Sequence, residues 1–160
     1  MKVLGIDPGI AITGYGIVEQ ILKEKPRALD FGCIRTSKDL TSFRLKKIYD
    51  GVDELIELHR PDVIAVEELF VYKNVKTAMS VGQSRGVIIL AGVNSGIEVA
   101  EYTPLQVKQS VVGYGRATKN QVQQMVKILL NLDQLPKPDD AADALAIAIC
   151  HINSAGLRGL

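Results

Sequence analysis

The spacing of apolar and polar positions changes along the chain, and near its start it predicts strands. An apolar run at residues 3–6 leads to the carboxylate of Asp7 and stops at the breaker Pro8-Gly9, which is typical of a buried strand. Two further runs, residues 14–18 and 29–35, are rich in β-branched and aromatic side chains. We therefore expect a meander of three strands, with Asp7 at the end of the first.

A second apolar run repeats this pattern. Residues 63–66 are fully apolar and are followed by two carboxylates, Glu67 and Glu68. If the two runs are parallel neighbours in one sheet, Asp7 and one of the glutamates emerge together at the carboxyl edge, where α/β proteins place their ligands. Alternation along the strand does not decide between Glu67 and Glu68.

Steps of three and four residues between apolar positions predict helices in much of the remaining sequence. The helices are expected at residues 42–58, 77–94, 104–112 and 118–132 and from Asp139 onward, with a short strand at 97–102. Within the second helix, Gly82 and Gly86 share one face, which favours the close approach of another element. Because no linker or internal repeat divides the sequence, we expect residues 1–160 to form one α/β domain.

The composition limits the class of protein. Hydrophobic residues make up 47% and charged residues 23%, as in a soluble globular protein, and the longest apolar stretch, residues 87–93, is too short to cross a bilayer. Cys33 and Cys150 are isolated, which predicts neither a zinc site nor a disulfide framework and fits a reducing cytoplasm. Because Met1-Lys2 leads straight into the first strand, we expect no signal peptide.

The net charge of +1 hides an uneven distribution. Between residues 69 and 132 only Glu98 and Glu101 are acidic, while the flanking segments are net acidic. The basic residues of this middle segment are Lys73, Lys76, Arg85, Lys108, Arg116, Lys119 and Lys127. Such a segment can attract a phosphate backbone to one face, although an ordinary solvated surface is an equally good explanation of the charges alone.

Four carboxylates are candidates for a shared site. Asp7 and Glu67 end predicted strands, and Asp140 and Asp143 lie three residues apart at a helix start. A turn cap would explain Asp7, and the helix dipole would explain Asp140, but Asp143 lies among small, core-facing residues. Gathered in one cleft, the four would repel one another unless a cation neutralised them. Oxygen ligands suit Mg²⁺ or Mn²⁺, and two such ions about 4 Å apart can hydrolyse a phosphodiester.

Two other features bear on the chemistry. Lys119 lies in the first turn of a predicted helix, where a cation opposes the helix dipole, so we interpret it as a functional charge. Residues 113–116 lack the glycine spacing and the preceding strand of a dinucleotide site. His59 and His151 are expected to be helix-end or surface residues and not ligands.

These motifs together resemble those of the RuvC family of crossover-junction endodeoxyribonucleases, over nearly the whole chain. The matching stretches are residues 5–9, 67–70 with 73–74, 82–86, 102–104 with 106–109, and 140–146. The resemblance implies a ribonuclease H-like α/β fold with a mixed five-stranded sheet flanked by helices. It also implies a homodimer that makes paired, Mg²⁺-dependent nicks in four-way DNA junctions, leaves ligatable 5′-phosphate and 3′-hydroxyl ends, and works with the branch-migration proteins RuvA and RuvB.

The resemblance also implies roles for individual residues. By motif position the metal ligands are Asp7, Glu67, Asp140 and Asp143, and Lys119 matches a basic position near the active site. Some family members carry His where Asp140 stands, so this position tolerates a second type of ligand. Phe70 matches a phenylalanine at the junction centre, where it would stack on an unpaired base, whereas burial in the core is the alternative. The expected DNA contacts are Phe70, Lys73, Lys76, Arg85, Lys108 and Arg116.

Three alternative functions were weighed against this one. An actin-like phosphotransferase uses a similar Asp-containing strand end, but it needs two such domains and far more than 160 residues. A non-catalytic junction-binding module would keep the basic segment without a complete acidic set. A resolvase-like nuclease that acts on RNA is the closest enzyme alternative.

Overall fold

A mixed five-stranded sheet forms the centre of the computed structural model, which describes residues 1–22, 24–69 and 74–158. The strand order is β3-β2-β1-β4-β5. The strands are β1 Lys2–Asp7, β2 Ile12–Glu19, β3 Arg27–Arg35, β4 Val63–Glu67 and β5 Glu98–Tyr102. The first three strands are antiparallel neighbours, and β4 lies parallel to both β1 and β5, so the predicted meander and the predicted parallel pair are both confirmed.

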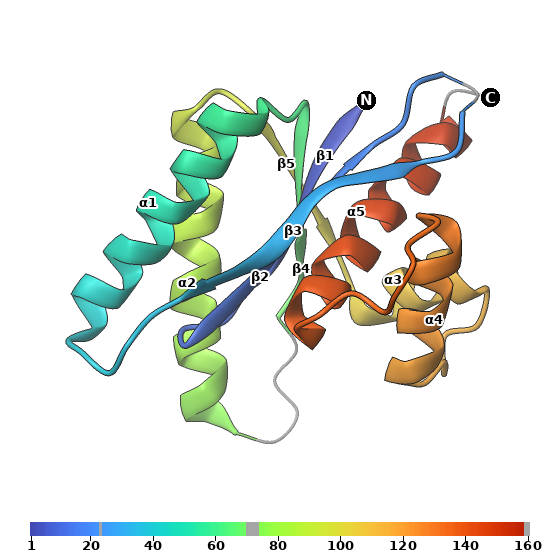
Figure 1. The fold of residues 1–160 in the computed structure, drawn as a ribbon. Coiled ribbons are helices and arrows are strands. Elements are labelled where there is room, and N and C mark those ends of the chain that lie inside the picture. The colour runs from blue at the N-terminus through green and yellow to red at the C-terminus, as the bar shows by residue number, and fades with distance from the viewer. Residues whose placement is uncertain (23, 70–73, 159–160) are drawn as a thin grey trace.

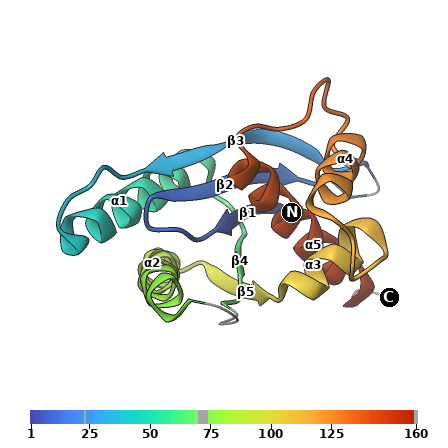
Figure 2. The ribbon, with the colours of Figure 1, turned by 90° about the horizontal axis from the view of Figure 1, so that it is seen from below.

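Helices cover both faces of the sheet (Figures 1 and 2). One face carries α1 Thr41–His59 and α2 Val75–Asn94, which pack against each other. The other face carries α5 Asp139–Arg158, which contacts β1 and β2, with α3 Pro104–Val112 and α4 Lys119–Leu129 packed beside it. This is the α/β ribonuclease H-like fold that the resemblance implied.

Strand alternation sorts the side chains of the sheet into two cores. Leu4 and Ile6 of β1 belong to the cluster that packs against α1 and α2. Val3 belongs to the cluster around α5, and so does Ala65 of β4. Since successive side chains point to opposite faces, Asp7 and Glu67 continue the rows of Val3 and Ala65 and face α5.

The α5 helix lies unusually close to the strands because glycines meet it there. A Cβ atom added at Gly14 would lie 2.0 Å from the carbonyl oxygen of Asp140, and one added at Gly5 would lie 2.1 Å from that of Ala144. No other residue type fits these positions without displacing the helix backbone. The glycines of β1 and β2 thus bring the start of α5 to the edge where β1 and β4 end.

Several local expectations are corrected. The α4 helix ends at Leu129 and not at residue 132, because Asn131 adopts a left-handed conformation (φ 51°) and Leu132 N–H bonds back to Lys127 O at 2.9 Å. His151 is buried and not a surface residue, and its Nδ1 lies 2.8 Å from the Tyr102 hydroxyl. A Cβ at Gly86 would meet no atom of the described residues within 4 Å, so the close approach expected at this glycine is not made by any described element. Among the described residues, no helix is long and apolar enough to cross a membrane.

Candidate active site

Two carboxylates emerge side by side from the sheet. β1 and β4 run parallel with Ile6 opposite Val66, so the next residue of each strand, Asp7 and Glu67, stands at the same carboxyl edge. Both side chains are half-buried on the face covered by α5. Glu68 continues away from this row, and its N–H bonds to Tyr102 O at 2.8 Å. Its carboxylate is not among the groups that line the cleft described below, whereas that of Glu67 is.

The start of α5 supplies two more carboxylates. The helix begins at Asp139, directly after Pro136, Lys137 and Pro138. Asp140 and Asp143 are both half-buried on the turn that approaches the strands, while Asp139 is exposed. Alanines on either side of Asp143 are fully buried, so this turn is anchored in the core and cannot move independently of it.

A cleft of about 260 Å³ joins these groups. Its polar lining consists of Asp7, Glu67, Asp143, Lys108 and Lys119, and its apolar wall consists of Pro104, Val107, Val122 and Ala146. The lining therefore comes from β1, β4, α3, α4 and α5, which are distant in sequence. Figure 1 shows the ends of these strands and the start of α5 at the same lower edge of the molecule, with α3 and α4 beside them.

The carboxylates of the cleft resist ionisation together. Burial raises the pKa of Asp7 to about 8, and the negative charges of Glu67, Asp143 and Asp140 contribute to the rise while Lys119 opposes it. Burial likewise raises the pKa of Glu67 to about 7, with Asp143 adding to the effect. Such shifts are expected where like charges share a partly desolvated site, and a cation in the cleft would reverse them.

Lys119 is the cation nearest to this cluster. Its Nζ lies 3.1 Å from Asp143 Oδ2 and 3.7 Å from Asp139 Oδ2. Desolvation alone would lower the pKa of the Lys119 ammonium, but the hydrogen bond and the charge of Asp143 outweigh it and raise that pKa. Lys108 of α3 also lines the cleft, and its charge opposes the rise in the pKa of Glu67. One phosphate bound in the cleft would therefore lie near the carboxylates and also near two ammonium groups.

Comparison with known proteins agrees with this geometry. The family described as crossover junction endodeoxyribonuclease RuvC matches residues 3–151. The chain belongs to the RuvC family. It is 59% identical to the RuvC protein of Caldanaerobacter subterraneus subsp. tengcongensis over 155 residues, which cover 96% of this chain and 93% of that one. It is 57% identical to the Desulforamulus reducens protein, over 94% of this chain and 93% of that one.

Solved structures are similar as well. Thermus thermophilus RuvC superimposes with a TM-score of 0.91 at 38% identity, covering 99% of this chain and 97% of the other. T. thermophilus RuvC in complex with a Holliday junction substrate gives a TM-score of 0.89 at 36% identity, covering 98% of this chain and 96% of the other. A yeast mitochondrial Holliday junction resolvase shares the fold with a TM-score of 0.68 at 20% identity.

The donor set of this RuvC-family cleft fits a hard divalent cation. All four candidate ligands are carboxylates, and burial with mutual repulsion raises the pKa of Asp7 and Glu67, which a dication would relieve. The side chains are not closed into a coordination sphere, since in the described part of the chain no three His, Cys, Asp or Glu side chains are grouped closely enough to hold an ion. Asp140 acts on Asp7 through its charge but does not line the cleft.

The remaining predicted contacts lie outside the cleft. Lys76, in the first turn of α2, and Arg116, in the loop before α4, are both exposed. Arg85 is ion-paired with Glu101 of β5, and among the described residues its buried Nε has no hydrogen-bond partner. Phe70 and Lys73 lie outside the described residues.

Sequence reasoning missed the apolar wall of the cleft. Val107 and Val122 are buried members of the core around α5, and Ala146 is buried on α5 itself. In sequence they are indistinguishable from any other residue on an apolar helical stripe, so no local pattern identifies them. Pro104 was recognised only as the first residue of a helix, which the Thr103 capping box confirms.

Proposed function

We propose that this chain is an endonuclease that resolves four-way (Holliday) DNA junctions by paired, metal-dependent nicks. The observation that carries the proposal is the convergence of carboxylates from β1, β4 and α5 with two lysines in one cleft. Its membership of the RuvC family and its likeness to a T. thermophilus protein bound to a Holliday junction substrate support junction DNA as the substrate. The nicks are expected to leave 5′-phosphate and 3′-hydroxyl ends.

The proposed ligands are Asp7, Glu67, Asp140 and Asp143, which would hold two Mg²⁺ ions, with Mn²⁺ as a substitute. When bound, such ions activate a water for attack on the phosphodiester and neutralise charge on the leaving oxygen. The protein fixes the geometry, because Asp7 and Glu67 are held by adjacent parallel strands and Asp143 by a buried helix. The apolar wall of Val107, Val122 and Ala146 limits water to the polar side of the cleft.

Two lysines would position the scissile strand. Lys108 and Lys119 lie on α3 and α4 and line the cleft from the side opposite the strands. Lys119 is held by Asp143, so we propose that it stabilises the charge that develops on the phosphate. Phe70, Lys73, Lys76, Arg85 and Arg116 are proposed as further DNA contacts along a wider path, and Arg85 could reach DNA only if its pair with Glu101 opened.

We further propose a homodimer in which α2 packs against α2 of a second copy. Val75, Met79, Leu90 and Val93 of α2 are exposed by 50–67% and recur at helical spacing on one stripe. Gly86 lies on the same stripe and would let a second backbone approach closely, since no described atom lies within 4 Å of its Cβ position. A two-fold dimer would present one cleft to each of two DNA strands, as paired nicking requires.

We also propose a cellular compartment, partners and a domain extent. The two cysteines are free, which fits action in a reducing cytoplasm. RuvA and RuvB are proposed partners on family membership alone. We treat residues 1–160 as one nuclease domain, because helices on both faces share the single sheet.

The decisive experiment uses a labelled synthetic four-way junction with Mg²⁺, compared with a linear duplex and an RNA substrate. We expect symmetric nicks in the junction alone, which DNA ligase can seal, and no cleavage in EDTA. Preferential cutting of RNA would favour the RNA nuclease instead. Junction binding with no cleavage under any divalent metal would indicate a non-catalytic binding module.

The dimer can be tested separately. Leu90→Glu places a charge on the proposed α2 contact, and we expect it to give a monomer in sedimentation while the fold is kept. Ile128→Glu is the matched control, because Ile128 is an exposed aliphatic side chain on α4, at 66% against 50% for Leu90. A dimer that survives Leu90→Glu would refute the α2 interface. A monomer that still cuts both strands in one encounter would refute the need for a dimer.

A further inference from the structure

The two ends of β3 carry the same residue type in different electrostatic settings. Arg27, the first residue of the strand, is ion-paired with Glu19 at 2.7 Å. Arg35, the last residue, is exposed and has no carboxylate within ion-pair distance in the described part of the chain. Arg35 stands at the same edge of the sheet as Asp7, whereas Arg27 stands at the far edge.

Three more cations lie near Arg35, and we call these four residues the β3–α1 corner. They are Arg35, Lys38, Arg44 and Lys47. Within the described residues none of the four takes part in an ion pair, whereas Lys46, which is not part of the corner, is paired with Asp50 at 2.5 Å. Asp39 accepts the Leu40 N–H at 2.7 Å, and Asp50 is paired with Lys46. The four cations of the corner are unpaired among the described residues, although Asp30, Asp50 and Glu54 line the same surface hollow as Arg35 and Lys47.

Hydrogen bonds connect the β3–α1 corner to the turn that follows Asp7. Thr36 donates its N–H to Ala11 O at 3.0 Å and its hydroxyl to Ile10 O at 2.5 Å. Arg44 donates from Nε to Thr36 Oγ1 at 2.9 Å, so the start of α1 is linked to the same turn. These bonds fix the corner relative to the carboxylates and leave the outer nitrogens of the Arg44 guanidinium without a protein acceptor among the described residues.

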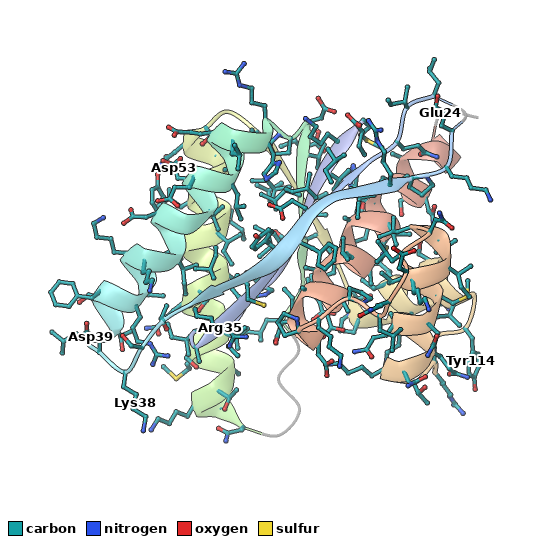
Figure 3. The ribbon with its side chains drawn as sticks, viewed as in Figure 1. Glu24, Arg35, Lys38, Asp39, Asp53 and Tyr114 are labelled. Carbon is teal, nitrogen blue, oxygen red and sulfur yellow. The ribbon has the colours of Figure 1, made fainter. Side chains whose placement is uncertain are left out.

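The corner lies on the opposite side of the carboxylates from Lys108 and Lys119. In the sheet register Asp7 faces Gly14, which faces Cys33, two residues before Arg35. Cys33 is two strands away from Asp7, so the two residues are about 10 Å apart. This distance equals about three nucleotide rises of DNA. Figure 3 shows Arg35 and Lys38 on one side of the start of α5, and Tyr114, which marks the α3–α4 loop, on the other. Figure 2 shows the strand ends between these two sides.

We infer that the β3–α1 corner is a second phosphate-binding surface, which holds the DNA backbone on the far side of the cleft from Lys108 and Lys119. The inference rests on the proposed function and extends it, because the sequence assigned the DNA contacts to residues 70–119 alone. A DNA strand that crosses the carboxylates is then bound by cations on both sides of the scissile phosphate. Charge and position both fit a phosphate backbone, since the corner carries four cations and adjoins the strand row that lies about 10 Å, or about three nucleotide rises, from Asp7.

The test compares two double variants that remove the same charge from opposite ends of one strand. Arg35→Ala/Lys38→Ala removes two cations of the corner, and Lys25→Ala/Arg27→Ala removes two from the far end of β3. Affinity for a four-way junction is measured in EDTA as a function of salt. We expect the corner variant to weaken binding and to reduce the slope of log affinity against log salt by about two. The far-end variant should leave both quantities unchanged.

Each outcome is decisive. An unchanged slope in the corner variant, or an equal change in both variants, would overturn the inference and leave the proposed function intact. Failure of the unmodified protein to bind the junction would instead overturn the proposed function. If the corner variant melts at a lower temperature, Lys38→Ala/Lys47→Ala provides the second test, because both side chains are exposed and make no described hydrogen bond or ion pair. It should reduce the slope by the same amount.

Discussion

The two faces of the sheet are built from different side chains. On the α1 and α2 face, large aliphatic residues from strands and helices interlock and are fully buried, among them Leu4, Ile6, Ile48, Ile64 and Ile88. On the α5 face, glycines of the strands meet alanines and the backbone of the helix. The first face holds its helices through buried volume, and the second brings a helix backbone close enough to place carboxylates beside a strand end. Large aliphatic residues such as Ile147 and Ile149 are buried on the α5 side as well, but the apolar wall of the cleft belongs to that side alone, so catalytic geometry depends on the α5 face.

The largest effect is expected from Asp7→Asn, a substitution on the α5 face. The change preserves shape but removes a proposed metal ligand from the α5 face, so we expect cleavage to fall by at least about a hundred-fold. Junction affinity in EDTA should not fall, because phosphate contacts supply the affinity and the lost charge was negative. Asp50→Asn on the other face is the matched control and should cleave normally. Loss of binding together with cleavage in Asp7→Asn would contradict the division of roles.

The next prediction removes close packing without touching a carboxylate. In Gly14→Ala the added Cβ would lie 2.0 Å from the carbonyl oxygen of Asp140, so the start of α5 must shift. We expect about a hundred-fold slower cleavage, since displacements near 1 Å have such effects, and about 1–3 kcal/mol lower stability. Gly156→Ala, on the same helix with no atom within 4 Å of the added Cβ, should leave cleavage unchanged. Normal cleavage by Gly14→Ala would show that close approach is not required.

A truncation on the aliphatic face should have the reverse effect. Ile88 is fully buried between α2 and the sheet, and Ile88→Ala is expected to lower the free energy of unfolding by about 2–5 kcal/mol. Below the melting transition, cleavage per folded molecule should match the parent, because no residue of the cleft belongs to this cluster. Urea unfolding and a cleavage assay on the same sample measure both quantities. A reduced rate at full folding would show that the two faces are coupled.

Part of this difference between the two faces of the sheet can be predicted from the sequence. Two apolar runs that end in acids implied that, if the strands were parallel neighbours, Asp7 and one of two glutamates would meet at one edge, and the structure shows this parallel pair. The sequence also placed Asp143 among small, core-facing residues, and these lie in the helix that packs closely on the strands. The family resemblance supplied the choice of Glu67 over Glu68, which the structure supports by placing Glu67 in the cleft.

Other features depended on contacts between distant segments. The burial of His151 against Tyr102 and the pairing of Arg85 with Glu101 are set by how helices pack on β5, and no periodicity encodes them. The charge of the β3–α1 corner was hidden because its cations come from a net acidic stretch of sequence. Within that stretch residues 35–47 carry five cations and the single acid Asp39, so totals taken over longer segments misjudged where the positive surface lies.

The smallest expected effect concerns the pH dependence of stability without metal. Burial raises the pKa of Asp7 to about 8 and that of Glu67 to about 7, from ordinary values near 4. Between those limits the folded protein binds more protons than the unfolded chain, so stability is greatest at low pH within this window and is lost as pH rises through 7 and 8. The loss is at most about 1.4 kcal/mol per pH unit for each group.

In EDTA, we therefore expect the melting temperature to fall from pH 6 to pH 8 and to level off above that. Asp7→Asn should flatten the fall and make the metal-free protein more stable than the parent at pH 8, because it removes the carboxylate that is most costly to ionise. Asp50→Asn, an exposed position on the α1 side, should leave the slope unchanged. Melting curves at constant ionic strength measure this directly. A slope unaffected by Asp7→Asn would mean that the α5 face carries no electrostatic strain, and the contrast between the faces would then be one of packing alone.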